Sequence, residues 1–254
     1  GFDKKRKHYH VWEFERKLKT FFSPQMADTL CVSSGTAAIK VALKALGIGR
    51  GDQVITQAFN FIATVEAIVD TGAKVIFSDI DDTLNMSAKS LEKLITKKTK
   101  AIIPVHMLGV PADMISINRI GKRNKIPVIE DACEAIGAKV ASKYVGGLSE
   151  FGVFSFDFGK MITTGEGGAL FTKRKSDGKN ARMYHDHGHK NIPNLPRGLD
   201  RAGLVGFNYR MTEISGAFGK VQLEKFPRIL RDSKKRYRTL EKYIKHNDIK
   251  FRTV

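Results

Sequence analysis

Residues 154–168 read FSFDFGKMITTGEGG, an aromatic run that leads into one lysine and then into a glycine-rich segment. Residues 152–156 have the apolar character of a buried strand, and residues 163–171 predict a turn followed by a further strand. Lys160 therefore lies just beyond a strand, in surroundings where burial disfavours its charged form. A neutral amine there is a nucleophile suited to carbonyl chemistry. The alternative is a surface lysine in a loop, which is the default in a chain with 44 lysines and arginines.

Outward from this stretch, short apolar runs alternate with helical patterns. The apolar runs predict strands at residues 53–57, 74–78, 101–105, 127–130 and 152–156. The helical patterns fall at residues 61–70, 88–96 and 112–124. This alternation predicts an α/β fold with a mostly parallel sheet between helices. In such sheets the ligand lies outside the carboxyl ends of the strands.

After about Lys173 the sequence pattern becomes helical and rich in basic residues. We expect two long helices, at residues 212–226 and 227–246, and residues 249–254 read as a strand without partners. The sequence therefore predicts a large domain over residues 1–227. Residues 228–254 would be a helix leading into a truncated C-terminal small domain.

Residues 33–38 read SSGTAA and open the strongly apolar helix predicted at residues 36–46. Ser34 is a good N-cap, and Gly35 permits a close approach of a ligand to the backbone. The free N–H groups of the first turn, with the Thr36 hydroxyl, would form an anion cradle. The alternative is a capped helix without a ligand.

Residues 128–134 read VIEDACE, so that two acids end a hydrophobic strand and face the expected crevice. Asp131 is either a cap of a following helix or a carboxylate that pairs with a protonated ring nitrogen. Residues 206–213 read GFNYRMTE. There Thr212 is the expected cap of the next helix, while Asn208 and Arg210 are also compatible with ordinary loop positions. Residues 185–189 read HDHGH, but alternating histidines spread to opposite faces of a strand, and we expect no metal.

The formal net charge of +18 leaves three explanations open: a nucleic-acid binder, a site for anionic substrates, or lysines on solvated faces. The basic residues are spread along the chain and are not interleaved with aromatics, so we expect no nucleic-acid partner. Apolar runs are too short to cross a membrane, and the charged N-terminus is not a signal peptide. The two cysteines, Cys31 and Cys133, indicate reduced thiols in a cytoplasmic protein.

Taken together and in order, these segments resemble the DegT/DnrJ/StrS-type sugar aminotransferases, a fold-type I family that uses pyridoxal 5'-phosphate (PLP). The resemblance runs from about Val11 to about Pro227. It implies an aspartate-aminotransferase-like large domain. It also implies that Lys160 holds PLP as a Schiff base and that Asp131 pairs with the pyridine nitrogen, which keeps the ring an electron sink.

The resemblance assigns further roles. Phe61 matches the position whose ring stacks on the cofactor, and Glu134 lies near its phenolic oxygen. Gly35, Thr36 and Ser155 would hold the phosphate. Two further positions extend the site. Asn208 would reach the phosphate of the neighbouring subunit in a homodimer, and His106, at the end of a strand, would face the substrate.

The implied reaction takes an amino group from an amino acid, by family habit glutamate, and delivers it to an anionic keto or aldehyde sugar. Lys160 would move the proton. Family acceptors are nucleotide-linked sugars for lipopolysaccharide or glycans, and residues 185–198 are similar to a subgroup that aminates Kdo. Two alternatives stay open: a regulatory protein with this fold, or a truncated relative that binds PLP without turnover. The intact Lys160 favours transamination over dehydration, since family dehydratases carry histidine at that position.

Overall fold

The computed structural model describes residues 9–192, 195–244 and 252. The strands are β1 (Asp28–Val32), β2 (Gln53–Gln57), β3 (Lys74–Ser78), β4 (Thr99–Ile103), β5 (Ile129–Asp131), β6 (Lys139–Val140), β7 (Lys143–Tyr144), β8 (Phe151–Ser155) and β9 (Gly168–Thr172). The helices are α1 (His10–Phe22), α2 (Gly35–Ala45), α3 (Ile62–Val69), α4 (Ala88–Leu94), α5 (Met114–Asn124), α6 (Lys175–Tyr184) and α7 (Glu213–Tyr243), with 3-10 turns at Met107–Gly109 and Arg197–Leu199.

The central sheet is built from two hydrogen-bonded groups of strands, in the orders β1-β9-β8-β5 and β3-β2-β4. Isolated parallel bridges, Ile102 with Val128 and Val105 with Asp131, join β4 to β5. The resulting order is β1-β9-β8-β5-β4-β2-β3, in which β9 alone runs antiparallel to its neighbours. The predicted α/β fold with a mostly parallel sheet is therefore confirmed.

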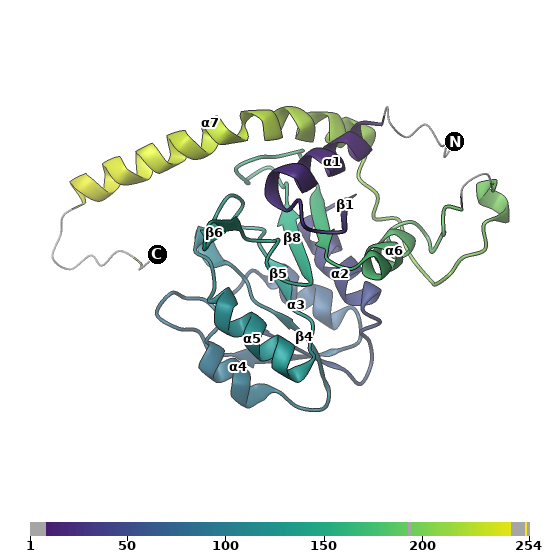
Figure 1. The fold of residues 1–254 in the computed structure, drawn as a ribbon, viewed down its shortest axis with the longest axis horizontal. Helices are drawn as coiled ribbons and strands as arrows, with labels where there is room; N and C mark the ends of the chain where they lie inside the picture. The colour runs from purple at the N-terminus through teal and green to yellow at the C-terminus, as the bar shows by residue number, and fades with distance from the viewer. Residues whose placement is uncertain (1–8, 193–194, 245–251, 253–254) are drawn as a thin grey trace.

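Helices cover both faces of this sheet (Figure 1). Successive side chains of β8 and β9 point to opposite faces and divide the core into two clusters. Val153 and Leu170 pack toward α2 and α6, whereas Phe154 and Phe171 pack toward α1 and α7. This is the expected result of side chains that point to opposite faces at successive strand positions. A third apolar cluster lies between β2, β4, α4 and α5.

One long helix, α7, replaces the two helices expected on either side of Pro227. The expected break was wrong, because a proline within a helix removes one hydrogen bond without necessarily ending it. Phe226, directly before it, is fully buried and anchors this part of α7 to the core. Beyond this point α7 extends past the body (Figure 1). The domain boundary at residue 227 stays a prediction, and the strand expected at 249–254 falls outside the described residues except for Arg252, which is in no strand.

Two side chains close the outer edge of β1. Arg182 on α6 forms a bidentate pair with the Asp28 carboxylate, at 2.6 and 2.8 Å, and donates to the Thr29 carbonyl at 2.7 Å. Glu15 on α1 accepts the Cys31 N–H at 2.8 Å. Burial raises the pKa of the Glu15 carboxyl, and the nearby Arg182 guanidinium opposes that shift. Within the described ranges, no helix is long and apolar enough to span a membrane.

Candidate functional site

The N-terminus of α2 lies directly against the end of β8. Ser34 caps the helix, since its Oγ accepts the Ala37 N–H at 3.0 Å. A Cβ on Gly35 would stand 2.9 Å from Cβ and 3.3 Å from Oγ of Ser155. A Cβ on Gly168 would stand 2.3 Å from the Ser34 carbonyl oxygen. The two glycines thus allow the first turn of the helix to meet the sheet. The unpaired N–H groups of such a turn, with Thr36 and Ser155, suit an anion.

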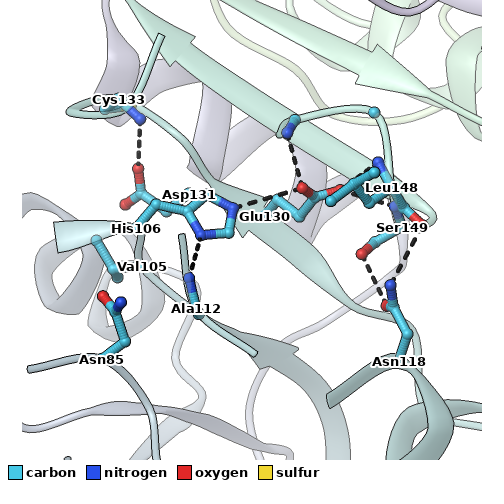
Figure 2. A network of polar contacts seen from close by, with 12 residues as sticks. Asn85, Val105, His106, Ala112, Asn118, Glu130, Asp131, Cys133, Leu148 and Ser149 are labelled. Carbon is cyan, nitrogen blue, oxygen red and sulfur yellow. Dashed lines mark hydrogen bonds and ion pairs between the residues drawn. The ribbon is translucent and has the colours of Figure 1, made fainter. Parts of the chain in front are cut away.

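Asp131 ends β5 and is 4% exposed. Its Oδ2 accepts the Thr64 hydroxyl at 2.7 Å, and its Oδ1 accepts the Cys133 N–H at 3.2 Å, as Figure 2 shows for Cys133. Turns, and not a helix, follow β5 as far as β6. The alternative that Asp131 caps a following helix is therefore wrong. Its carboxylate is held at the carboxyl end of a strand by donors on both oxygens.

Cys133 connects the groups around Asp131. Its Sγ would be 3.1 Å from a Cβ on Gly35. Burial, followed by the negative charge of Asp131, raises the pKa of the Cys133 thiol well above its usual value, whereas the positive charge of Lys160 opposes that shift. The first turn of α2 and the Asp131 segment therefore meet at Cys133, and the Lys160 charge acts on the same thiol.

The Lys160 backbone is held by a turn at Asp157. The Lys160 N–H donates to the Asp157 carbonyl at 3.1 Å, and the Asp157 carboxylate accepts the Gly159 N–H at 3.0 Å. The Ser155 hydroxyl accepts the Asp157 N–H at 3.4 Å. These bonds link the lysine segment to the end of β8, while the Lys160 side chain stays partly exposed.

Phe61 precedes α3 as its N-cap residue and is 63% exposed. An aromatic ring that open to solvent has a free face on which another flat ring can stack. Phe61 and Thr64, the hydroxyl partner of Asp131, both lie at the start of α3.

Glu134 is half-buried, and its Oε2 accepts the Leu108 N–H at 3.0 Å. Leu108 has a φ of 53°, in the left-handed region, so this bond supports a strained turn after β4. The expected role of Glu134 near the cofactor's phenolic oxygen stays a prediction.

His106 does not face the crevice, contrary to expectation. It is 0% exposed, and its Nδ1 accepts the Ala112 N–H at 3.0 Å (Figure 2). The proton of the neutral ring therefore sits on Nε2, which points to Oε2 of Glu130 at 3.4 Å. Burial in this network explains why a residue at a strand end is unavailable to substrate.

Glu130 is the centre of that network and is itself fully buried. Its carboxylate accepts N–H groups of Gly146 at 2.7 Å, Leu148 at 2.6 Å and Ser149 at 2.7 Å. Of these two neighbouring acids in β5, Glu130 thus holds the 146–149 loop, whereas Asp131 bonds to Thr64 and Cys133.

Asn208 lies on the surface, and its side-chain oxygen accepts the Arg210 N–H at 3.3 Å. Arg210 forms an ion pair with Asp186 and bridges to Val32, at the end of β1. Asn208 is thus exposed, and the neighbouring Arg210 is held by Asp186 and Val32. The expected contact of Asn208 with a neighbouring subunit stays a prediction.

No group of three or more histidine, cysteine, aspartate or glutamate side chains suited to a metal occurs within the described ranges. His185 instead donates from Nδ1 to the Arg182 carbonyl at 2.5 Å, and burial lowers its pKa to about 4.

Sequence reasoning missed Thr64 and the role of Cys133. Thr64 belongs to the segment 59–64 that contains Phe61, and this closeness in sequence is a usable signal. Nothing in the sequence places Cys133 beside Gly35, because these positions meet only when α2 packs on the sheet.

The assembled groups fit a flat, phosphate-bearing pyridine ring. The first turn of α2, at the close contact of Gly35 with Ser155, has backbone N–H groups suited to an anion, and Asp131 is a buried carboxylate with donors on both oxygens. Lys160 supplies an amine, and Phe61 supplies an exposed ring. Each of these groups has a counterpart on such a molecule: phosphate, ring nitrogen, carbonyl carbon and ring face.

Comparisons with known proteins agree with this reading. The chain matches the DegT/DnrJ/EryC1/StrS aminotransferase family over residues 5–253. It is 41% identical over 224 residues to a GDP-perosamine synthase of Escherichia coli, a match that covers 85% of this chain and 57% of that protein. The chain spans little more than half the length of the curated relatives it matches.

Two solved structures are similar across most of the chain. Helicobacter pylori PseC, an aminotransferase involved in the biosynthesis of pseudoaminic acid, has a TM-score of 0.86 and 28% identity, covering 94% of this chain and 64% of its own. The Escherichia coli GDP-4-keto-6-deoxy-D-mannose-3-dehydratase with bound hydrated PLP has a TM-score of 0.78 and 31% identity, covering 86% and 61%. The fold is that of fold-type I PLP enzymes, as the resemblance implied.

Proposed function

Because the chain belongs to the DegT/DnrJ/EryC1/StrS aminotransferase family, we propose that the protein transfers an amino group from an amino acid to a keto or aldehyde sugar. The convergence of Lys160, Asp131 and the Gly35–Ser155 contact is the observation that carries this proposal. PLP is the cofactor of this site, and when bound it supplies an electrophilic carbon and an electron-withdrawing ring.

The chain's own residues would divide the work of binding. The first turn of α2, with Thr36 and Ser155, would hold the phosphate through N–H and hydroxyl donors. Phe61 would cover one face of the ring. The Asp131 carboxylate would hold a proton on the ring nitrogen, because an adjacent negative charge favours the charged form of its partner.

Lys160 would have two tasks: it would anchor the cofactor, and its amine, once released by the donor, would carry a proton between the substrate carbon and the cofactor carbon. The loop between β8 and β9 holds its backbone, so the amine can move over a short arc without leaving the site. Glu134 would stand near the phenolic oxygen, supported by its bond from Leu108.

A nucleotide-linked keto sugar is the favoured acceptor class. The similarity to GDP-perosamine synthases supports it, and the net charge of +18 suits a doubly charged pyrophosphate. A Kdo-like keto acid is the second class, on the pattern of residues 185–198. Glutamate is the proposed donor, and lipopolysaccharide or glycan synthesis the proposed use. Both cysteines are free thiols, which supports a cytoplasmic location.

We also propose a homodimer whose subunits complete each other's sites. Asn208 is exposed and would reach the partner's phosphate. Large apolar side chains that are exposed on the described surface include Phe59, Phe61, Phe158 and Phe207. Exposed apolar surface of this kind near a site favours burial against another molecule.

The second candidate is a protein that binds PLP without turnover. The coverage of 57% of the GDP-perosamine synthase is the observation that favours it. Dehydration is the less favoured reaction, because Lys160 stands where the family's dehydratases carry histidine.

The test uses the full chain, incubated with PLP and then with glutamate. We expect a visible absorbance band from bound PLP, its loss on addition of glutamate, and its return on addition of a GDP-linked 4-keto sugar. Borohydride reduction before glutamate should fix the cofactor to Lys160. Lys143→Arg, an exposed change in the β6–β7 hairpin, is the matched control and should not affect labelling.

Three outcomes would separate the alternatives. Label on another lysine removes the assignment of Lys160. A PLP band that glutamate leaves unchanged, while other amino acids also fail, favours binding without turnover. Return of the band with a Kdo-like keto acid and not with the GDP-linked sugar selects the second acceptor class.

A further inference from the structure

We infer that Thr64 is a positioning residue for Asp131, and that its hydroxyl helps to keep the proton on the ring nitrogen of the cofactor. This inference rests on the proposed function and adds a residue to it. Thr64 is 1% exposed, and its Oγ1 lies 2.7 Å from Oδ2 of Asp131. The two residues are 67 positions apart in the chain, so the bond joins α3 to the end of β5.

The direction of this hydrogen bond follows from chemistry. An ionised carboxylate only accepts, whereas a threonine hydroxyl both donates and accepts, so Thr64 donates to Asp131. A threonine hydroxyl within a helix commonly bonds back to a carbonyl of the preceding turn. Here the hydroxyl is directed to a different element, which makes Asp131 its specific partner.

The carboxylate is held from both sides. Thr64 donates to Oδ2, and the Cys133 N–H donates to Oδ1 at 3.2 Å. Two donors on two oxygens fix the rotation of the carboxylate plane, and the remaining lone pairs then point in set directions. Hydrogen bonds to an ionised acceptor are stronger than neutral ones.

The Thr64 bond also changes which group keeps the shared proton. A donor to the charged carboxylate stabilises that form and lowers its proton affinity. In the proposed complex, the proton between Asp131 and the ring nitrogen would then stay on nitrogen. Without the hydroxyl the carboxylate binds the proton more strongly, and the ring becomes a weaker electron sink.

Helix α3 couples this effect to cofactor stacking. Phe61 is the N-cap residue of α3, and Thr64 lies three residues later, in the first turn of the helix. One rigid helix start would thus place both the ring that covers the cofactor and the hydroxyl that orients its carboxylate.

The test compares Thr64→Val, which keeps the shape without the hydroxyl, with Thr64→Ser, which keeps the hydroxyl. Thr71→Val is the matched control, because Thr71 is also buried but donates to the Ile68 carbonyl at 2.7 Å. All are measured on the full chain loaded with PLP. The readouts are the pH midpoint of the cofactor's visible absorbance, the rate of the half-reaction with glutamate, and the donor KM.

For Thr64→Val we expect the half-reaction to slow by about tenfold, the effect of one bond to a charged group, with donor KM within about twofold of wild type. The absorbance midpoint should move to higher pH by about half a unit. A less positive ring withdraws less electron density from the nitrogen that joins Lys160 to the cofactor, so that this nitrogen keeps its proton up to a higher pH. Thr64→Ser should restore both values, and Thr71→Val should lose stability without changing either.

Unchanged rate and midpoint in Thr64→Val would overturn the inference, and so would equal losses in Thr64→Ser, which would show that packing alone is at stake. If the wild-type chain binds PLP and reacts with the donor while Thr64→Val behaves normally, only this inference fails. If the wild type neither binds PLP nor reacts, the proposed function and the inference fail together.

Discussion

Gly35 and Ser155 lie in contact, such that a Cβ on Gly35 would be 2.9 Å from the Cβ of Ser155. These residues come from the start of α2 and the end of β8, and the same Cβ would lie 3.1 Å from Sγ of Cys133. Real Cβ atoms are hardly ever this close to other carbon atoms, so the first turn of α2 has no room to carry a side chain here.

Gly35→Ala should therefore push α2 away from β8 and open the anion cradle. We expect PLP affinity to fall by about tenfold or more and the free energy of unfolding to fall by about 1–3 kcal/mol, the usual cost of overpacking. Gly198→Ala is the matched control, because a Cβ there meets no atom within 4 Å. Fluorescence titration of PLP and urea denaturation measure the two effects. Normal PLP affinity in Gly35→Ala would show that the phosphate binds elsewhere.

Asp131→Asn should retain PLP and lose nearly all turnover, because an amide of similar shape cannot hold the ring nitrogen protonated. The half-reaction with glutamate, followed by absorbance, is the direct measurement. We expect a loss of at least about a hundredfold, on the scale of an essential charge. Asp82→Asn, at an exposed acid, provides the control. A half-reaction close to the wild-type rate would remove Asp131 from its role.

Asn208→Ala should weaken PLP binding by about 1–3 kcal/mol, the cost of removing a charge-assisted hydrogen bond. The effect should appear only at protein concentrations where the subunits are paired, because the contact is made across the dimer. Asn124→Ala, at the exposed end of α5, is the control. PLP titrations above and below the dimer dissociation constant provide the measurement. An equal effect at both concentrations would place Asn208 within its own site.

His106→Ala should act on stability and not on substrate binding. The change leaves the Ala112 N–H and one side of Glu130 without a partner in a fully buried region, at a cost of about 2–4 kcal/mol. Urea denaturation should show this loss, while the acceptor KM stays within about twofold of wild type. His10→Ala, at an exposed histidine, should change neither. A raised acceptor KM without a loss of stability would restore the substrate role.

His185 should make the protein sensitive to mild acid. Burial lowers its pKa to about 4, whereas an unfolded histidine titrates near 6.5. Between these values the unfolded chain binds more protons, so stability rises with pH across this window and is lost as pH falls from about 6.5 to 4. The contribution is on the order of 3 kcal/mol.

His185→Gln keeps a polar side chain but removes the titrating group. Stability of this variant, measured by denaturation at pH 4.5 and 7, should fall less than that of the wild type. Parallel losses in both proteins would assign the acid sensitivity to other groups.

Periodic apolar runs predicted the sheet, because strands buried on both faces leave a continuous signal in the sequence. Their bounds moved by a few residues, as at β4 and β5. The strand β1 was not predicted. The helices α1 and α6 were not predicted either, because both carry many charges that mask their apolar stripes. At Pro227 the local sequence strongly predicted a helix break, but the packing of buried Phe226 outweighed it and α7 is continuous.

The motifs were enough to single out Lys160, Asp131 and Gly35 as candidates, and their roles toward the cofactor stay predictions. His106 and Glu130 show the limit of this reasoning. Glu130 lies within β5 and His106 follows β4, yet Glu130 bonds to the 146–149 loop and His106 points to Glu130. A position at the end of a strand predicts at which edge of the sheet a residue lies. The direction of a buried polar side chain depends instead on the hydrogen-bond partners that satisfy it.

The closed edge of β1 bears on how copies of this protein can associate. A bare edge strand offers unpaired backbone groups to any other strand, which is a route to sheet-to-sheet aggregation. Here the Cys31 N–H is taken by Glu15 and the Thr29 carbonyl by Arg182, so a strand from another chain finds these backbone positions already occupied. Copies of the chain must then meet through side-chain surfaces, whose shape and charge can be selected, and not by extending the sheet at this edge into a fibre.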